Sequence, residues 1–318
     1  MKLKEITIEV TQQCPNRCIY CSSLSDMEKT EALDFVTICK VADDAEALGA
    51  TSVSLSGGEP FLREDIVEII DYLKAKGLKV RVYSSGIYFN GQYTTIPTSL
   101  LESVKDKVDA LIFNYETIDA ELYASIMGTE PGNLALLDET IKTAVELGIP
   151  VEAHLVPMRC NYKQIPEVVR KLYSMGVKNV SFLRLVSQGR VLENREQVDL
   201  NTDEEKELQQ ILESLKETYH DKIRLGLPFS SKRATCRTGT VKLTVRYDGY
   251  VFPCEAFKDG MMTFKGFAPE NIRVKRLTEI YRDSEYIKAV REELAKYYEG
   301  EVSEPCFGQY CREQCKWE

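Results

Sequence analysis

Strand-like and helix-like segments alternate over residues 3–185 of this 318-residue chain, and this alternation leaves few possible folds. Short apolar runs predict strands, and longer segments with apolar residues at helical spacing predict helices. The predicted strands are residues 3–10, 51–55, 78–83, 110–113, 151–156 and 179–185. The predicted helices between them are residues 32–48, 65–76, 97–108, 134–147 and 164–175. Strands joined through helices run parallel, so we expect an α/β fold that forms a barrel or part of one.

Three cysteines, Cys14, Cys18 and Cys21, follow the first predicted strand within the sequence CPNRCIYC. Their thiols can converge on one metal centre, and a four-iron cluster held by only three cysteines leaves one iron open. An open iron can bind a substrate or a cofactor, which favours chemistry over electron storage. On spacing alone, a zinc knuckle or a set of buried thiols remains the alternative. Active sites of parallel barrels lie at the carboxyl ends of the strands, where this loop is expected.

Polar residues follow three further predicted strands. Two glycines after the second strand allow the backbone to approach a ligand closely, and the acid beside them can meet a cation. Hydroxyl, amide and carboxylate groups at a barrel mouth can bind a ribose or a carboxylate, although turn residues without a ligand role are the alternative. These residues are Ser56, Gly57, Gly58, Glu59, Pro60, Ser84, Ser85, Asn114 and Glu116.

Two residues of the fifth and sixth predicted strands also have side chains suited to a site. Arg184, placed on the sixth strand, can hold a carboxylate in bidentate fashion, although a structural ion pair is equally compatible with a lone arginine. His154 lies within the fifth strand, and an isolated histidine there is more typical of a hydrogen-bonded core residue than of a base.

The C-terminal third contains a second group of cysteines. Residues 240–245 alternate like a strand, and the turn residues after them predict a hairpin that brings Cys236 and Cys254 together. With Cys306, Cys311 and Cys315 the group has five thiols, enough for a second cluster with one to spare. A structural zinc ribbon is the alternative. With a helix predicted over residues 201–217, the expected domains are 1–195, a connector at 196–230 and 231–318.

The composition excludes several classes of partner. A net charge of −9 disfavours binding to duplex nucleic acid, which requires a basic surface. No apolar run approaches the roughly 18 residues that cross a bilayer, so we expect no membrane partner. Ten cysteines without a secretion signal indicate a reducing compartment and metal binding, so we expect the cytoplasm.

The cysteine loop, with Tyr20 at its aromatic position, and the GGEP motif resemble those of radical S-adenosylmethionine (SAM) enzymes over about residues 3–190. The resemblance implies a partial (β/α)6 TIM-like barrel with a [4Fe-4S] cluster on the three cysteines. The open iron would bind SAM, which is cleaved reductively to a 5′-deoxyadenosyl radical. Near such a radical, Cys160 could return a hydrogen atom to the substrate, although a buried thiol is the simpler interpretation. The implied SAM-binding residues are Tyr20, Gly57, Gly58, Glu59, Pro60, Ser84, Ser85, Asn114, Glu116 and Arg184.

The C-terminal cysteines resemble those of SPASM and Twitch extensions, which carry auxiliary [4Fe-4S] clusters. The segment from Cys236 to Cys254 fits the SPASM opening, CX12GX4C, but the ending CX4CX3C is shorter than that of a full SPASM domain. The resemblance therefore implies one auxiliary cluster. Its expected ligands are Cys236, Cys254 and Cys315, with either Cys306 or Cys311 as the fourth.

The resemblance favours a peptide maturase that crosslinks, epimerises or excises part of a ribosomally made peptide. A radical SAM dehydrogenase of a small molecule such as an aminosugar is the second hypothesis, and a non-catalytic iron-sulfur or zinc-binding protein is the third. A flavodoxin or ferredoxin is the expected reductant. Leader recognition is expected to use the barrel, the C-terminal region or a separate partner protein.

Overall fold

The computed structural model describes residues 2–226, 236–258, 263–299 and 306–314. Its centre is a nine-stranded sheet in the order β11-β10-β1-β2-β3-β6-β7-β8-β9. Six neighbouring strands within it are all parallel, which confirms the predicted partial (β/α)6 barrel. These are β1 (Glu5–Thr11), β2 (Ser52–Gly57), β3 (Lys79–Ser84), β6 (Ala110–Asn114), β7 (Val151–Leu155) and β8 (Asn179–Phe182).

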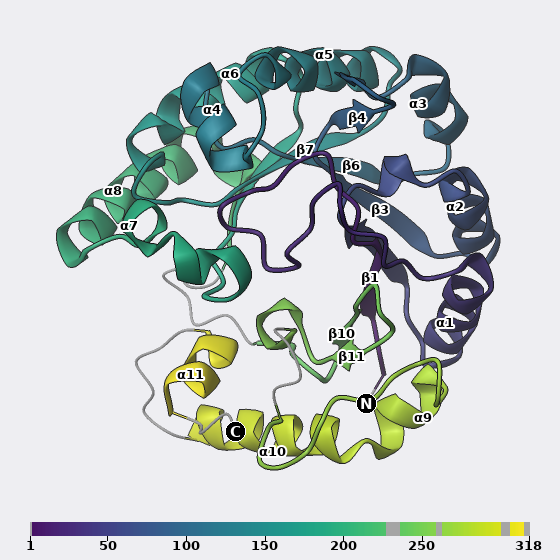
Figure 1. Ribbon diagram of the computed structural model, residues 1–318. Coiled ribbons are helices and arrows are strands. Elements are labelled where there is room, and N and C mark those ends of the chain that lie inside the picture. Colours follow the sequence, from purple (N-terminus) through teal and green to yellow (C-terminus); the bar gives the residue numbers. More distant parts are fainter. Residues whose placement is uncertain (1, 227–235, 259–262, 300–305, 315–318) are drawn as a thin grey trace.

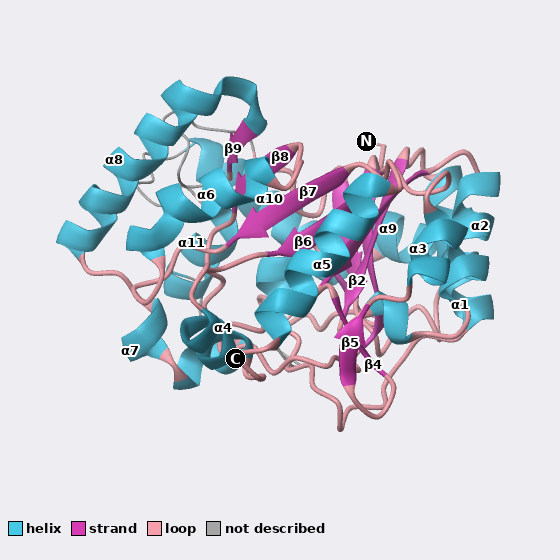
Figure 2. Cartoon of the chain, turned by 90° about the horizontal axis from the view of Figure 1, so that it is seen from above, coloured by secondary structure: helices cyan, strands magenta, loops and turns pink. Residues whose placement is uncertain are grey.

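Helices cover the outside of the curved sheet, as Figures 1 and 2 show from two directions. Their apolar faces explain the packing: on α2, for example, Ile66, Ile69, Ile70 and Leu73 are all buried. All five predicted helices are confirmed, with ends shifted by a few residues. They are α1 (Phe35–Ala47), α2 (Ile66–Ala75), α3 (Thr98–Val104), α5 (Asn133–Glu146) and α6 (Ile165–Ser174).

Three short elements and one boundary differ from the sequence prediction. Helix α4 (Ala120–Met127) was not predicted, although the Asp119 side chain caps it by accepting from the Leu122 backbone N–H. A small hairpin of β4 (Ile87–Phe89) and β5 (Tyr93–Thr95) was also missed. The placement of Arg184 on the sixth strand was wrong, because β8 ends at Phe182. Such short elements give too few residues for a periodic pattern to emerge.

The chain after β8 extends both edges of the sheet. Helix α7 (Arg195–Val198) is followed by α8 (Thr202–Tyr219), which confirms the helix predicted at 201–217, and then by β9 (Ile223–Leu225), parallel to β8. At the opposite edge, β10 (Lys242–Val245) pairs in parallel with β1 and forms the predicted hairpin with β11 (Val251–Phe252). Helices α9 (Leu277–Asp283), α10 (Glu285–Glu299) and α11 (Phe307–Gln314) complete this region.

Single-turn helices mark several loops. They are η1 (Pro60–Leu62), η2 (Tyr162–Gln164), η3 (Gly189–Glu193), η4 (His220–Lys222) and η5 (Glu255–Phe257). In the described ranges, none of the helices has both the length and the apolar character needed to span a bilayer.

Candidate active site

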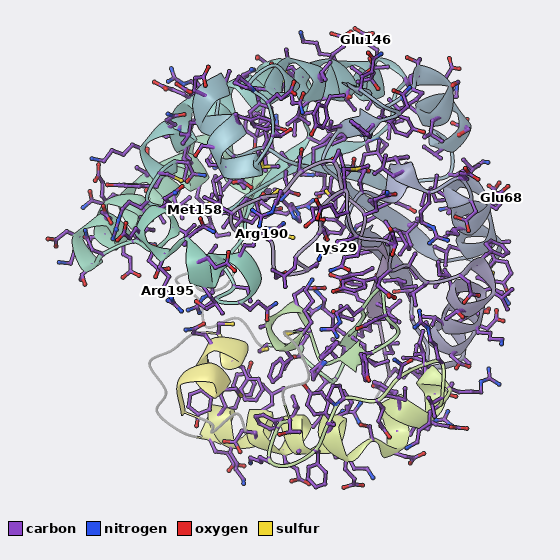
Figure 3. All side chains as sticks on the ribbon, viewed as in Figure 1. Lys29, Glu68, Glu146, Met158, Arg190 and Arg195 are labelled. Carbon is purple, nitrogen blue, oxygen red and sulfur yellow. The ribbon has the colours of Figure 1, made fainter. Side chains whose placement is uncertain are left out.

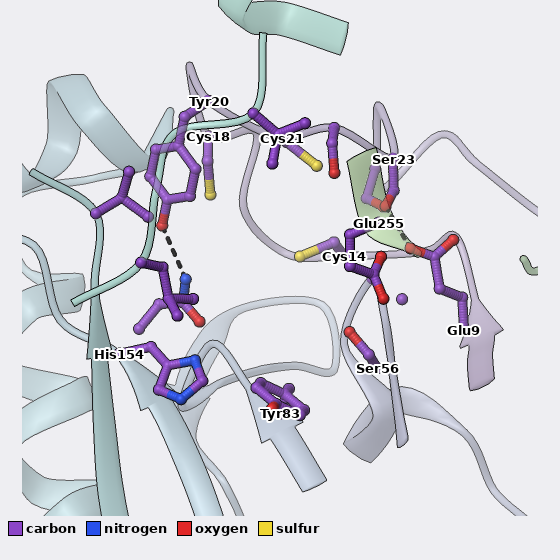
Figure 4. A pocket seen from close by; sticks show the side chains of 18 of the residues that line it. Glu9, Cys14, Cys18, Tyr20, Cys21, Ser23, Ser56, Tyr83, His154 and Glu255 are labelled. Atoms are coloured by element: carbon purple, nitrogen blue, oxygen red, sulfur yellow. Dashed lines mark hydrogen bonds between the residues drawn. The ribbon is translucent and has the colours of Figure 1, made fainter. Parts of the chain in front are cut away.

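A pocket of about 430 Å³ opens at the carboxyl ends of the barrel strands (Figure 4). Loops after several strands supply its walls, as expected for a parallel barrel. The C-terminal region closes one side with residues from β10 and the η5 segment. Lining residues include Cys14, Cys18, Cys21, Gly57, Gly58, Ser84, Ser85, Asn114, Arg184, Lys242, Glu255 and Lys258.

The three predicted cluster cysteines all line this pocket. Cys14 is buried, Cys18 and Cys21 are half-buried, and none of the three forms a disulfide. Burial, with the neighbouring thiols and Glu59 adding to it, raises the pKa of the Cys14 thiol well above its usual value. A bound metal ion stabilises the thiolate form and so offsets this effect of burial.

The surroundings of the thiols fit an iron-sulfur cluster. Asn16, 1% exposed, lines the same pocket, and its side-chain amide has no hydrogen-bond partner among the described residues. Three thiols with an unsatisfied donor beside them match the residues that hold a cluster and its sulfur atoms. No three His, Cys, Asp or Glu side chains in the described part are arranged to hold a metal ion.

Two segments hold the cysteine loop in place. The C-terminal end of α4 accepts backbone hydrogen bonds from Arg17 (2.8 Å) and Ile19 (2.9 Å). From the other side Arg190, 4% exposed, donates to the carbonyl oxygens of Cys18 (2.7 Å) and Ser25 (2.6 Å). Figure 3 shows Arg190 near the centre of the molecule, whereas Glu68 and Glu146 lie at the periphery. The Arg190 guanidinium therefore orients the loop.

Tyr20 and Glu116 form a buried network behind the loop. The Tyr20 hydroxyl donates to Glu116 Oε1 (2.8 Å) and accepts from Asn114 Nδ2 (3.0 Å), and the Val156 N–H donates to Glu116 Oε2 (2.9 Å). Burial raises the pKa of Glu116 to about 8. Glu116 is fully buried and outside the pocket lining, so its position favours support of Tyr20 over direct ligand contact.

Residues of the GGEP motif have two roles: some line the pocket, and one holds neighbouring loops together. A Cβ on Gly57 would overlap the Thr11 carbonyl, and one on Gly58 would overlap the Gln13 carbonyl, so only glycine allows the two loops to meet. Glu59 is fully buried, and its carboxylate accepts hydrogen bonds from the Ser85 N–H (2.6 Å), the Ser84 hydroxyl (3.0 Å) and others. Gly57 and Gly58 line the pocket, whereas Glu59 connects the loops after β2 and β3 from behind.

The remaining predicted residues lie at different depths. Arg184 lines the pocket just after β8. His154 also lines it, in edge-to-face contact with Tyr83 at 5.1 Å between ring centroids, and burial lowers its pKa to about 3. Cys160 is half-buried outside the pocket lining, and Pro60 is the buried first residue of η1.

Sequence reasoning missed the charged groups that close the pocket. Lys242, Glu255 and Lys258 come from the C-terminal region, and Glu9 comes from β1. The spacing of Glu255 and Lys258 allows an ion pair between them, at 3.0 Å. An acid directly after Cys254, followed three residues later by a lysine, was the available signal.

The auxiliary cysteines are only partly described. Burial, and next the neighbouring Cys236, raise the pKa of the Cys254 thiol to about 12, and Cys306 contributes to the raised pKa of Cys236. Cys236 therefore lies near both Cys254 and Cys306. Cys311 is fully buried in the apolar cluster on α11, and Cys315 lies outside the described residues.

Two family models match the chain. Residues 8–172 match the Radical SAM superfamily model, and residues 236–316 match the SPASM model, described as an iron-sulfur cluster-binding domain. Among curated proteins, the PqqA peptide cyclase of Methylobacterium sp. (strain 4-46) is 28% identical over 89% of this chain and 74% of its own length. The probable GTP 3′,8-cyclase of Methanococcus maripaludis is 22% identical over 82% of this chain and 88% of its own.

Solved structures share the fold. Streptococcus suis SuiB bound to its precursor peptide SuiA matches with a TM-score of 0.72 and 17% identity, over 91% of this chain and 67% of SuiB. Native anSMEcpe with bound AdoMet and a Cp18Cys peptide matches with a TM-score of 0.67 and 13% identity, over 98% and 86%.

Proposed function

Since this chain belongs to the radical SAM superfamily, we propose that it modifies a ribosomally made peptide by abstracting a hydrogen atom from it. It is a radical SAM enzyme that uses SAM and [4Fe-4S] clusters. The observation that carries the proposal is a single pocket lined by Cys14, Cys18 and Cys21 on one side and by the C-terminal region on the other.

The residues fit their roles in this reaction. Cys14, Cys18 and Cys21 would hold the cluster, which would supply the electron for reductive cleavage of bound SAM and thereby the radical chemistry of the reaction. Arg190 and the Tyr20–Glu116 pair hold the cysteine loop in position. Gly57 and Gly58 leave backbone exposed to the pocket where a ligand can approach.

A peptide substrate is supported by the similarity to PqqA peptide cyclases over most of the chain. The same fold holds a precursor peptide in SuiB. We infer formation of a crosslink within the peptide as the first modification to test, with epimerisation and backbone excision next. A flavodoxin or ferredoxin reductant and a separate leader-binding partner complete the proposal.

We also propose one auxiliary cluster held by Cys236, Cys254, Cys306 and Cys315. The nearness of Cys236 to both Cys254 and Cys306 supports Cys306 as the fourth ligand. This cluster lies next to the wall that closes the pocket, where it can accept the electron left on the product or organise the substrate side.

Anaerobic reconstitution followed by assay of 5′-deoxyadenosine from SAM with dithionite tests the enzyme chemistry. Replacement of Cys14, Cys18 or Cys21 with alanine should abolish its formation. Cys39→Ala is the matched control, since Cys39 lies on α1 outside the pocket and should leave the rate unchanged. Persistence of SAM cleavage in the three loop variants would falsify the cluster assignment.

Co-expression with short peptides encoded near the gene tests the substrate. Peptide modification should appear as a mass change that depends on the three loop cysteines. If sugar-biosynthesis intermediates, but no peptide, stimulated SAM cleavage, the small-molecule dehydrogenase would replace this proposal.

A further inference from the structure

The pocket wall built by the C-terminal region carries two lysines with different surroundings. Lys258 is 5% exposed, and its ammonium donates to Glu9, to Ser23 Oγ at 2.9 Å and to Glu255 Oε2 at 3.0 Å. Glu255 Oε1 in turn accepts from the Thr244 hydroxyl at 2.9 Å. Figure 4 shows Glu9, Ser23 and Glu255 grouped on the Cys14 side of the pocket. Lys258 is therefore fully compensated by groups of the protein.

Lys242 differs in that the described residues offer its ammonium no direct acceptor. It is the half-buried first residue of β10 and lines the pocket. Its ammonium forms neither a hydrogen bond nor an ion pair within 4.0 Å to any residue that the structure describes. Burial opposes its charge, but the nearby Glu255 and other negative groups raise its pKa above the usual value. The ammonium therefore stays charged in the pocket wall, and its hydrogen-bonding capacity is available to an acceptor on a ligand.

The position of Lys242 separates it from the cysteine loop. Lys242 is level with Glu5 at the start of β1, whereas the loop follows the end of β1 at Thr11. Six residues of strand span about 20 Å, so the Lys242 backbone lies deep in the barrel on the side away from the thiols. A ligand group that meets its ammonium would therefore lie at the deep end of the pocket, away from the cysteine loop.

We propose that Lys242 binds a carboxylate of the substrate, so that the modified peptide presents an acidic side chain or a free C-terminus to this wall. The inference rests on the proposed function, because it names the chemical class of the peptide. An ammonium that meets a carboxylate gains a charge-assisted hydrogen bond, whereas an amide in the same place offers only a weaker, neutral acceptor.

Equilibrium dialysis of three synthetic peptides against the reconstituted enzyme with SAM tests the proposal. Ac-Gly-Glu-Gly-NH2 carries a side-chain carboxylate, Ac-Gly-Gln-Gly-NH2 is its amide isostere, and Ac-Gly-Gly-Gly-OH carries only a terminal carboxylate. We expect at least one of the two acidic peptides to bind about tenfold more tightly than the glutamine peptide. In Lys242→Gln the preference should fall below twofold, and Lys242→Arg should retain part of it.

Lys79→Gln is the matched control, because Lys79 is the exposed first residue of β3 in the same sheet and should leave the preference intact. Equal binding of acidic and glutamine peptides to the wild-type enzyme would overturn the inference. A preference for acidic peptides that survives in Lys242→Gln would also overturn it. The same holds if the preference survives while the variant loses iron, since Lys242 would then only balance the charge of Cys254. SAM cleavage by the wild type reports separately on the proposed function.

Discussion

Individual side chains at this site mostly hold other groups in place. The carboxylate of Glu116 accepts from the Tyr20 hydroxyl and from a backbone N–H while remaining fully buried. The positions of Tyr20, Asn114 and Glu116 followed from their places after predicted strands. Their mutual hydrogen bonds could not be predicted, because loop conformation decides which side chains of neighbouring loops meet.

Tyr20→Phe should lower the free energy of unfolding of the cluster-free protein by about 1–3 kcal/mol, because the buried carboxyl group of Glu116 loses a hydrogen-bond donor. Urea denaturation of the apoprotein measures this. Tyr88→Phe is the control, since Tyr88 on β4 is only partly buried and should change stability by less than about 0.5 kcal/mol. Equal stability of the two variants would show that the Tyr20 hydroxyl supports nothing.

His154 gives a pH dependence whose sign is set by its lowered pKa. Burial, followed by the positive charges of Arg224, Lys242 and Arg81, lowers the pKa to about 3, so the folded state stays unprotonated where the unfolded chain binds a proton. Neutral His154 therefore stabilises the folded state fully above about pH 6.5. This stabilisation is lost as the pH falls toward 3, by at most about 1.4 kcal/mol per pH unit.

When the pH is lowered from 7 to 5, the free energy of unfolding should therefore fall less in His154→Gln than in the wild type. Urea denaturation at the two pH values measures this. His220→Gln, at an exposed turn, should follow the wild type. Parallel curves for the wild type and the His154 variant would contradict the assignment of a neutral buried histidine.

Whole elements determine the shape of the cysteine loop. The end of α4 and the η3 segment hold it from two sides, and glycines allow both approaches: a Cβ at Gly128 would overlap the Arg17 carbonyl, and one at Gly189 the Cys21 carbonyl. The core strands and helices were predictable from hydrophobic period. Helix α4 and the η3 segment could not be predicted in this way, because each is short and its role depends on contacts with residues far away in the sequence.

Gly189→Ala should reduce the iron retained after reconstitution by about fourfold or more, because the added methyl group displaces the backbone at Cys21 and Ser22. Gly148→Ala is a close control: both glycines have positive φ, 60° and 78°, but a Cβ at Gly148 meets no atom within 4 Å. Both variants carry the strain of that backbone conformation, roughly 1 kcal/mol. Iron analysis that shows equal losses would attribute the effect to strain alone.

At the scale of the whole molecule, the C-terminal region is part of the barrel wall. The barrel and the cysteine-rich extension were both predictable from motif order. The parallel pairing of β10 with β1 was not predictable. The two strands are more than 230 residues apart, and the local sequence does not indicate such a pairing. The charged wall of Lys242, Glu255 and Lys258 follows from that pairing and escaped prediction for the same reason.

Cys254→Ala should lower the iron content of the reconstituted protein from about eight to about four atoms per chain, because each four-iron cluster needs its thiolates. SAM cleavage without peptide should persist to some degree, since the loop cysteines remain. Iron and sulfide analysis measures the first expectation and chromatography of 5′-deoxyadenosine the second. An iron content unchanged from wild type would remove the auxiliary cluster from the proposal.

The pairing of β1 with β10 also sets an order of events during synthesis. One edge of β1 has its partner β2 soon after the ribosome produces it, but the other edge waits for β10. Until then an apolar strand presents open hydrogen-bonding groups, the kind of edge that recruits other chains. The nascent barrel therefore has an unfinished side for most of its translation, and a holding chaperone or rapid completion of the C-terminal region would protect it.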